Sequence, residues 1–290
     1  AVLARGSDGA AGLRVWAITG TNGKSTTTTM AGTIAQQRDP QAFVGGNLGT
    51  PLCQSIVEGL TAGTAAAPRL LVVELSSYQL ESLQHLPVHA ATVTNLTPDH
   101  LDRYPAVDDY YAAKARLFDL MGDGAGVSLN AADKETRRFL FPRLRGLFVS
   151  CHFDVLPAEP GVEITGDRLI ARRPGAADVE LTLSNPRIVG HHNKQNAAAA
   201  AALALLSGFT KREIQDGLDA YGGIAHRLER VGDHHGVTWW NDSKATNVDA
   251  AVTALKSFQS GVHLIGGGKV KGSPYEALVG YSRAVVAGDD

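Results

Sequence analysis

The sequence predicts an α/β protein: a mostly parallel sheet of P-loop type, flanked by helices and bearing a small antiparallel edge, then an incomplete second α/β domain. Three observations support this fold class. Short apolar runs at 15–19, 70–74 and 90–95 alternate with segments long enough for helices. A glycine turn and then Lys-Ser follow the first run, and the whole pattern restarts beyond Gly222-Gly223. Apolar runs of this kind are typical of strands buried on both faces of a parallel sheet.

The composition limits the size and the partners of the protein. With 290 residues, the chain has room for one large or two ordinary domains. It is 44% hydrophobic with a net charge of −2, which indicates neither disorder nor a surface for nucleic acid. The longest apolar run, Ala197–Leu206, is too short to cross a bilayer. Without a signal peptide, Cys53 and Cys151 fit incidental thiols of a cytoplasmic protein.

Both ends of the sequence suggest a fragment. A Gly/Ala-rich lead-in without an initiating Met opens the chain, and an apolar run, Ala284–Ala287, stops just before its end. We therefore expect a lead-in over 1–13, a complete central domain over 14–223, and the start of a further domain over 224–290.

The first strand, Val15–Thr19, runs into a glycine turn and a helix-length stretch, in the order VWAITGTNGKST. Glycines let backbone N–H groups approach phosphate oxygens, and a helix N-terminus adds positive potential. A lysine there reaches the terminal phosphates, and a hydroxyl can ligate Mg²⁺. The loop is shorter than G-x-x-x-x-G-K, because Ile18 stands where that pattern needs glycine, and a plain Gly-rich turn is the alternative. We predict that ATP binds through Gly20, Thr21, Asn22, Gly23, Lys24, Ser25 and Thr26.

The next two strands also end in polar groups. A short strand at 43–46 leads into Asn47, whose amide could reach a bound molecule, although an ordinary turn is the simpler interpretation. The run LLVVE ends in Glu74, and a carboxylate at such a strand tip is typical of Mg²⁺ sites. The alternative is a glutamate that faces water. Ser76 follows with a hydroxyl group.

The third buried strand, Ala90–Asn95, is followed by Asp99, His100 and Asp102. Two carboxylates and an imidazole within one turn suit a metal or a phosphate, while a hydrogen-bonded structural histidine is the alternative. Next comes a predicted helix over 107–120, in which Lys114 falls among the apolar and aromatic positions. By default such a lysine extends its amine to the solvent.

The rest of the chain continues the alternation of strands and helices. Residues 151–184 predict an antiparallel hairpin at the sheet edge. An Ala/Leu-rich helix follows HHNKQN, and a capping box at Thr210 and Glu213 starts the next helix. Beyond residue 223 we expect strands at 227–231, 237–240 and 262–265.

Eight motifs stand in a fixed order along the chain: GTNGKST, VGGNLG, VVELSSYQLE, NLTPDHLDRYP, YYAAKARLF, HHNKQNAAAA, HRLE and NDSKATN. Together they resemble the Mur ligase family, from about Arg14 to the end of the chain. The resemblance implies a three-domain enzyme with a central ATPase domain and a C-terminal Rossmann-like domain. It implies ATP-dependent amide formation through an acyl phosphate, adding D-glutamate to UDP-N-acetylmuramoyl-L-alanine for peptidoglycan. A monomer that binds only small molecules is expected.

The resemblance also assigns roles to single residues. It implies two Mg²⁺ sites, one at Ser25 and Glu74 and one at His100 and Lys114, with the lysine carbamylated. A carbamate is an anion, so it accounts for a lysine beside a cation. It implies catalytic roles for Lys24, His100 and Lys114. It implies nucleotide contacts for Asn193, Asn196, Arg227 and Asp242. It implies substrate contacts for Asn47, Ser76, Lys244, Thr246 and Lys271.

One motif departs from the family pattern, which has a single lysine two residues after Gly-Gly. Here GGGKVKG offers Lys269 and Lys271, and we favour Lys271 for the glutamate carboxylate. Two alternatives to the function stay open. One is another member of the superfamily, such as a diaminopimelate- or lysine-adding ligase or a folylpolyglutamate synthase. The other is a nucleotide-binding module that does not turn over.

Overall fold

The computed structural model describes residues 12–61, 68–144, 146, 148–258, 261–268 and 275–280. They fall into two compact units. Unit 1 runs to residue 185 and takes in residues 194–221, and unit 2 takes in residues 186–193 and the chain from residue 222 onward. Lys269 and Lys271 lie outside the described residues.

Unit 1 is built on a six-stranded parallel sheet with the order β2-β3-β1-β4-β5-β6, which confirms the predicted fold class. Its middle strands are mostly apolar and almost completely buried because helices cover both faces of the sheet. With β1 between β3 and β4, the carboxyl ends of these three strands meet at one edge. The strands are β1 Arg14–Thr19, β2 Phe43–Gly46, β3 Leu70–Glu74, β4 Val88–Val93, β5 Met121–Leu129 and β6 Val149–Ser150.

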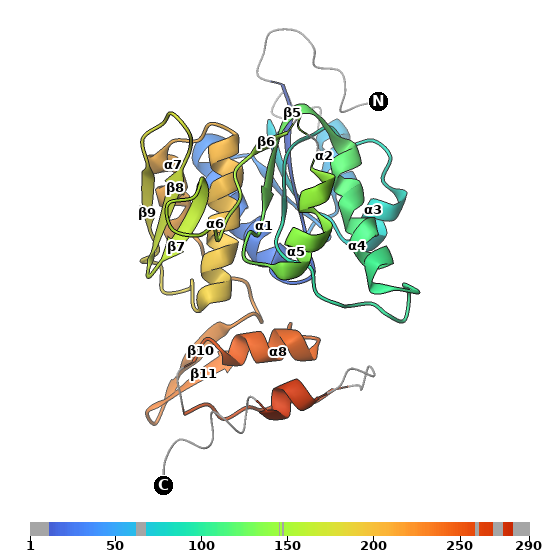
Figure 1. Ribbon diagram of the computed structural model, residues 1–290. Helices are drawn as coiled ribbons and strands as arrows, with labels where there is room; N and C mark the ends of the chain where they lie inside the picture. The colour runs from blue at the N-terminus through green and yellow to red at the C-terminus, as the bar shows by residue number, and fades with distance from the viewer. Residues whose placement is uncertain are drawn as a thin grey trace. The chain divides into compact units, whose positions relative to one another are not determined.

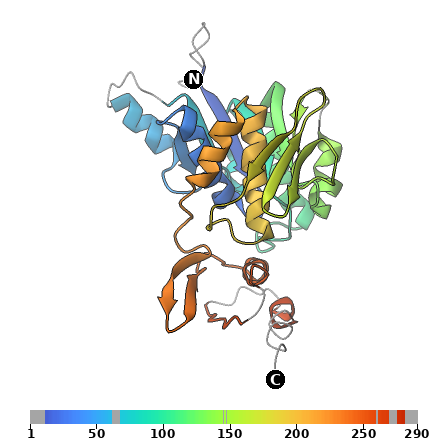
Figure 2. The ribbon, with the colours of Figure 1, turned by 90° about the vertical axis from the view of Figure 1, so that its left-hand side faces the viewer.

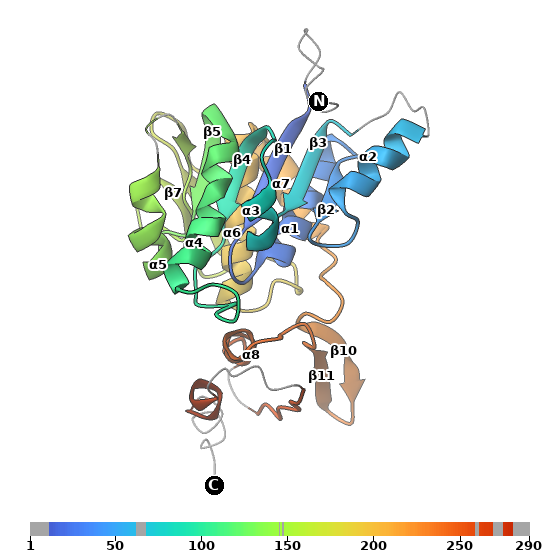
Figure 3. The same cartoon turned by 90° about the vertical axis from the view of Figure 1, so that its right-hand side faces the viewer.

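Helices α1, α6 and α7 cover one face of the sheet, and α3, α4 and α5 cover the other (Figures 1 and 3). Trp16 of β1 packs on the first face, with its ring centroid 5.1 Å from that of Phe209, and its neighbours Val15 and Ala17 belong to the core on the second. No described helix is long and apolar enough to cross a membrane. The helices are α1 Lys24–Arg38, α2 Leu52–Thr61, α3 Ser77–Ser82, α4 Val107–Ala115, α5 Lys134–Phe139, α6 His191–Leu206 and α7 Lys211–Asp219.

The helix predicted over 107–120 changes its geometry partway. It is α-helical as α4 and continues as a 3₁₀ helix over Arg116–Leu120, and a second 3₁₀ turn spans Phe141–Arg143.

The predicted hairpin forms, but as part of a separate sheet rather than as an edge of the main one. Strands β7 Gly161–Thr165, β8 Arg168–Arg172 and β9 Val179–Thr182 pair antiparallel in sequence order. In Figures 1 and 2 this small sheet lies beside α6. All six alanines from Ala197 to Ala202 in α6 are fully buried. Small side chains let this helix pack closely against its neighbours.

A buried histidine near this small sheet predicts an acid-sensitive fold. His152 accepts a hydrogen bond from the backbone N–H of Leu129, and burial lowers its pKa from 6.5 to about 4. The unfolded chain therefore binds more protons than the folded one between these values, so stability is full above about pH 6.5 and falls toward pH 4. Urea denaturation at pH 7 and pH 5 should show this loss, and the His152→Gln variant should show a smaller one. Equal losses in both proteins would contradict the prediction.

The described part of unit 2 contains a two-stranded antiparallel sheet, formed by β10 Glu229–His234 and β11 Val237–Asn241, and the helix α8 Val248–Leu255. Residues 276–280 are helical as well. The predicted strand at 227–231 begins later than expected, because His226 and Leu228 adopt left-handed backbone angles, with φ of 66° and 40°. The strand expected at 262–265 is wrong, since these residues are not in a strand. Within the described part of the unit, no strand pairs with residues 262–265, and an extended segment needs such a partner for its backbone groups.

Candidate active site

The loop between β1 and α1 has a backbone that only glycine can adopt at two positions. Gly20 has φ of 140°, and an added Cβ would lie 2.0 Å from Oγ1 of Thr94. Gly23 has φ of 81°, and its Cβ would lie 2.3 Å from Oδ1 of Asn196. Glycine at both positions lets the chain approach α6 and the end of β4 closely. Asn196 also accepts a hydrogen bond from Oγ1 of Thr27, so it contacts the loop region from α6.

The N-terminus of α1 opens directly from this loop. Its N-cap is Gly23, which has no side chain to cap the first amides of the helix. The Nζ of Lys24 lies 2.8 Å from the carbonyl oxygen of Thr21, so the ammonium folds back over the loop. A 15-residue helix that starts without a side-chain cap, with a lysine in its first turn, can bind a phosphate group.

Residues just after β4 hold the loop in place. The side chain of Asn95 accepts a hydrogen bond from the backbone N–H of Asn22 at 2.9 Å and donates one to its carbonyl at 3.0 Å. The hydroxyl of Thr21 donates to the carbonyl of Thr97 and accepts from its N–H, both at 3.0 Å. Thr94 donates to Asn22 as well. We call Thr94, Asn95 and Thr97 the latch; sequence reasoning missed it, although the motif NLTPDH contains most of it.

Removing one latch side chain should loosen the loop. We expect Asn95→Ala to weaken Mg-ATP binding by about 10-fold, because two hydrogen bonds of ~0.5–1.5 kcal/mol each are lost. Isothermal titration calorimetry on the chain measures the effect, with Asn185→Ala as a control for a buried asparagine whose amide bonds to the carbonyls of Leu218 and Tyr221 instead of the loop. Unchanged affinity in Asn95→Ala would show that the latch does not shape the nucleotide site.

Glu74 and Asn47 meet at the end of β3. Only 1% of Glu74 is exposed, and its Oε1 accepts a hydrogen bond from Nδ2 of Asn47 at 2.9 Å. Its Oε2 is buried without a hydrogen-bond partner among the described residues. A buried carboxylate oxygen that lacks a donor is expensive, and a divalent cation would compensate it. This side chain therefore fits a Mg²⁺ ligand.

Lys114 is buried rather than extended to the solvent, with 1% of its surface exposed. Its Nζ lies 2.8 Å from the carbonyl of Gly20 in the loop and 4.4 Å from the ring centre of Tyr110. Burial, reinforced by the charge of Lys24, holds its pKa well below the usual value of 10.5. An uncharged amine is a nucleophile, which an ammonium is not.

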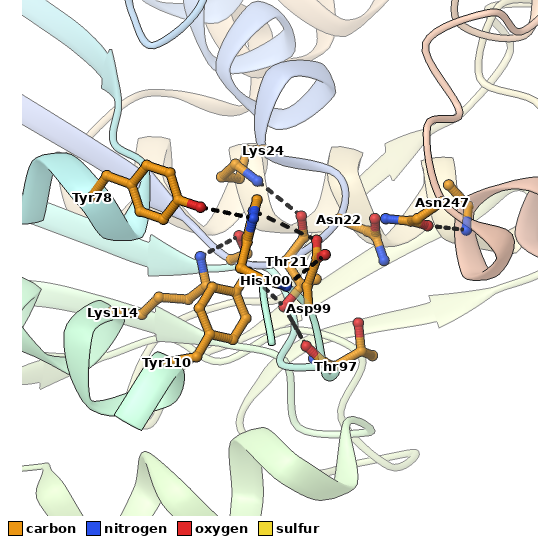
Figure 4. A network of polar contacts seen from close by, with 12 residues as sticks. Thr21, Asn22, Lys24, Tyr78, Thr97, Asp99, His100, Tyr110, Lys114 and Asn247 are labelled. Carbon is orange, nitrogen blue, oxygen red and sulfur yellow. Dashed lines mark hydrogen bonds and ion pairs between the residues drawn. The ribbon is translucent and has the colours of Figure 1, made fainter. Parts of the chain in front are cut away.

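His100 lies in the turn after β4, near Lys114 (Figure 4). Its φ is 55°, its ring lies 5.7 Å from that of Tyr110, and its Nδ1 lies 3.0 Å from Oη of Tyr78. Asp99 approaches the other ring nitrogen, with Oδ2 3.8 Å from Nε2. Within the described ranges, no three His, Cys, Asp or Glu side chains gather closely enough to hold a metal by themselves. A metal here would need other donors as well, such as a modified lysine, a hydroxyl or a nucleotide.

Three other predicted residues of unit 1 lie at the N-terminal ends of helices. Ser76 caps α3: its hydroxyl accepts from the N–H of Gln79, and the Gln79 side chain accepts from its backbone. Thr26 is buried in the first turn of α1, while Ser25 is partly exposed there. Of these two, Ser25 is thus the hydroxyl open to a ligand.

Unit 2 brings together two of its own predicted residues. Asp242 accepts a hydrogen bond from the N–H of Leu228 at 2.9 Å, and Arg227 lies close enough to lower the pKa of Asp242, although burial raises it overall. The Nε of Arg227 is buried without a hydrogen-bond partner in the described structure. Lys244 and Thr246 are exposed beyond β11. In the same unit, Asn193 bonds to the carbonyl of Val189 at 2.8 Å.

Comparisons with known proteins agree with this arrangement. Residues 18–204 match the family model described as Mur ligase middle domain. The chain is 42% identical over 292 aligned residues to UDP-N-acetylmuramoylalanine--D-glutamate ligase of Myxococcus xanthus, covering 96% of this chain and 60% of that protein. It is 43% identical to the Anaeromyxobacter dehalogenans protein of that name, covering 92% and 58%. The chain thus spans about three fifths of the length of these curated relatives.

Solved structures share the fold at lower identity. MurF from Acinetobacter baumannii matches with a TM-score of 0.61 and 24% identity, covering 84% of this chain and 54% of that one. A pseudomurein peptide ligase type C from Methanothermus fervidus matches with a TM-score of 0.61 and 19% identity, covering 85% and 56%.

Proposed function

The chain belongs to the Mur ligase family, and from this premise we propose that it serves the ATP-dependent addition of D-glutamate to UDP-N-acetylmuramoyl-L-alanine. The relatives named above carry the name of that activity. The observation that supports the proposal most directly is the Lys114 amine, which is buried against the carbonyl of the loop residue Gly20 and whose pKa burial lowers well below its usual value. Burying an amine in an apolar core costs free energy, so its position beside the loop fits a role in phosphoryl transfer better than a role in core packing.

A carboxylate resists attack by an amine, so the reaction needs an activated carbonyl. In the proposed reaction an oxygen of the L-alanyl carboxylate attacks the γ-phosphorus of ATP, and ADP leaves. The amine of D-glutamate then attacks the acyl phosphate, and inorganic phosphate leaves. Charge grows on the transferring phosphoryl oxygens, so the site must supply positioning and positive potential. The α1 amides and Lys24 lie where they can do both.

Two Mg²⁺ ions would supply charge neutralisation when bound. We assign Ser25 and Glu74 to the ion on the nucleotide, since the free Oε2 of Glu74 fits that role. We assign His100 and a carbamylated Lys114 to the second ion. A lowered pKa favours the neutral form of Nζ, and in this form the amine can add to CO₂, losing one proton and forming an N–C bond, so that the product is an anion. Tyr110 contacts both His100 and Lys114 and so keeps the two ligands side by side.

The other residues bind the reactants in this proposal. Asn47 and Ser76 contact the UDP-linked substrate near the phosphates, and Lys244, Thr246 and Lys271 contact D-glutamate. The nucleotide is held in addition by Asn193, Asn196, Arg227 and Asp242. The buried, unpaired Nε of Arg227 and the half-buried carboxylate of Asp242 support a polar ligand at unit 2.

The test is phosphate release and product formation by the chain with Mg-ATP, UDP-N-acetylmuramoyl-L-alanine and a panel of amino acids. Turnover with D-glutamate alone supports the proposal. Turnover with diaminopimelate or lysine instead would overturn the substrate and favour another ligase of the family. Absence of turnover, together with Mg-ATP binding that Lys24→Ala weakens, would overturn ligation by this chain and favour a nucleotide-binding module.

A further inference from the structure

We propose that Tyr78 is a positioning residue for His100: it fixes the imidazole in the tautomer that leaves Nε2 able to bind a divalent cation. The inference rests on the proposed role of His100 as a metal ligand. It adds a residue outside the ligand set, on a different helix from Lys114.

The geometry of the pair supports this role. The Oη of Tyr78 lies 3.0 Å from Nδ1 of His100, and the two ring centroids are 5.1 Å apart. A neutral imidazole carries one proton on its two nitrogens, and a nitrogen that binds a metal must be the unprotonated one. If Nδ1–H donates to the tyrosine oxygen, the lone pair is on Nε2. Metal-binding histidines are usually oriented in this way by a partner on the second ring nitrogen.

The imidazole needs such a partner because little else fixes it. About 43% of the His100 side chain is exposed, and its backbone has φ of 55° in an irregular turn. The ring contact with Tyr110 orients the plane of the imidazole, but it does not select the nitrogen that carries the proton. Asp99 Oδ2 lies 3.8 Å from Nε2, beyond hydrogen-bond distance, so among the described side chains the Tyr78 hydroxyl is the group that can accept a hydrogen bond from a protonated ring nitrogen, Nδ1.

Tyr78 is itself held firmly enough to act as a support. It lies on α3, which starts with the capping box of Ser76. The guanidinium of Arg103 stacks over its ring, with Cζ 4.4 Å from the ring centre, and bonds to Glu81 of the same helix. The backbone N–H of Arg103 bonds to the carbonyl of His100, which closes a ring of contacts around the pair. The tyrosine hydroxyl therefore faces Nδ1 before any metal binds.

Tyr104 provides a matched control. Its ring lies 6.3 Å from that of Tyr78 in the same aromatic cluster, but its hydroxyl donates to Glu81 rather than to His100. Removing this hydroxyl disturbs the same cluster and leaves the Nδ1 contact in place.

The experiment compares the chain with its Tyr78→Phe, Tyr104→Phe and His100→Ala variants in bicarbonate buffer. Mn²⁺ binding is followed by electron paramagnetic resonance, and the tautomer of His100 by ¹⁵N NMR on the metal-free proteins at pH 8. We expect Tyr78→Phe to weaken Mn²⁺ binding by about 10-fold, the lower end of the usual cost of losing such a partner. We also expect it to remove the Nδ1–H preference of His100, while Tyr104→Phe changes neither property.

Two outcomes would overturn the inference in different ways. If His100→Ala weakens Mn²⁺ binding and Tyr78→Phe matches the unmodified chain in affinity and tautomer, the positioning role is wrong and the metal site stands. If His100→Ala binds Mn²⁺ normally, the metal role of His100 fails, and the inference fails with it.

Discussion

Replacing Lys24 by alanine is expected to weaken Mg-ATP binding by about 10- to 100-fold, because a charge-assisted hydrogen bond contributes ~1.5–3 kcal/mol. The Nζ of Lys24 folds back onto Thr21 over the loop, and from there it can reach the phosphates. The amides of α1 remain in the variant, so weak residual binding should persist. Isothermal titration calorimetry with Mg-ATP on the chain gives the dissociation constants directly.

The matched control is Lys134→Ala, which removes an exposed lysine from the first turn of another helix, α5. It changes the net charge by the same amount and should leave the affinity unchanged. Equal affinity in Lys24→Ala and the unmodified chain would refute the phosphate-binding interpretation of the loop.

Replacing Lys114 by methionine is expected to abolish product formation and, at the same time, to stabilise the folded chain. Methionine keeps most of the side-chain volume and removes the amine, so the carbamate cannot form. We expect the carbamate ¹³C NMR signal in ¹³C-bicarbonate to disappear, Mn²⁺ affinity to fall by about 10-fold or more, and product formation to be lost. A carbamate signal that persists in Lys114→Met would assign it to another amine.

The same variant should be more stable than the unmodified chain in bicarbonate-free buffer at pH 7. Below pH 10.5 Lys114 is protonated in the unfolded chain, whereas burial lowers its pKa in the folded chain, so the folded chain binds this proton less tightly and loses stability. This cost shrinks as pH rises toward 10.5, so the difference between the two proteins should narrow between pH 7 and pH 9.5. Urea denaturation at these two values measures it, and a difference that widens would contradict the sign of the pKa shift.

The sequence predicted the parts of the fold that depend on local pattern. The runs that became β1, β3 and β4 are apolar because both faces of the sheet are covered, so their hydrophobicity marks them without further context. Glu74 at the end of β3 and Lys114 among aromatic positions could also be selected from the local pattern, because each is a charged residue within an apolar stretch.

Contacts between distant segments could not be predicted in this way. Asn95 bonds to Asn22, 73 residues away in the sequence, because β4 pairs with β1 in a register that brings the ends of the two strands together. Tyr78 and His100 meet only because α3 and the turn after β4 adjoin the same strand ends. Likewise, nothing in the composition of 226–228 indicates two left-handed residues ahead of β10.

The latch has a consequence for the thermodynamics of nucleotide binding. Thr94, Asn95 and Thr97 fix the loop backbone before a ligand arrives, so the conformational entropy of the loop is lost when unit 1 folds. Binding then need not order these residues a second time, and more of the contact energy remains as affinity. The loop should accordingly act as a rigid receptor for phosphate. The association rate should then be limited by diffusional encounter and charge, and not by rearrangement of the protein.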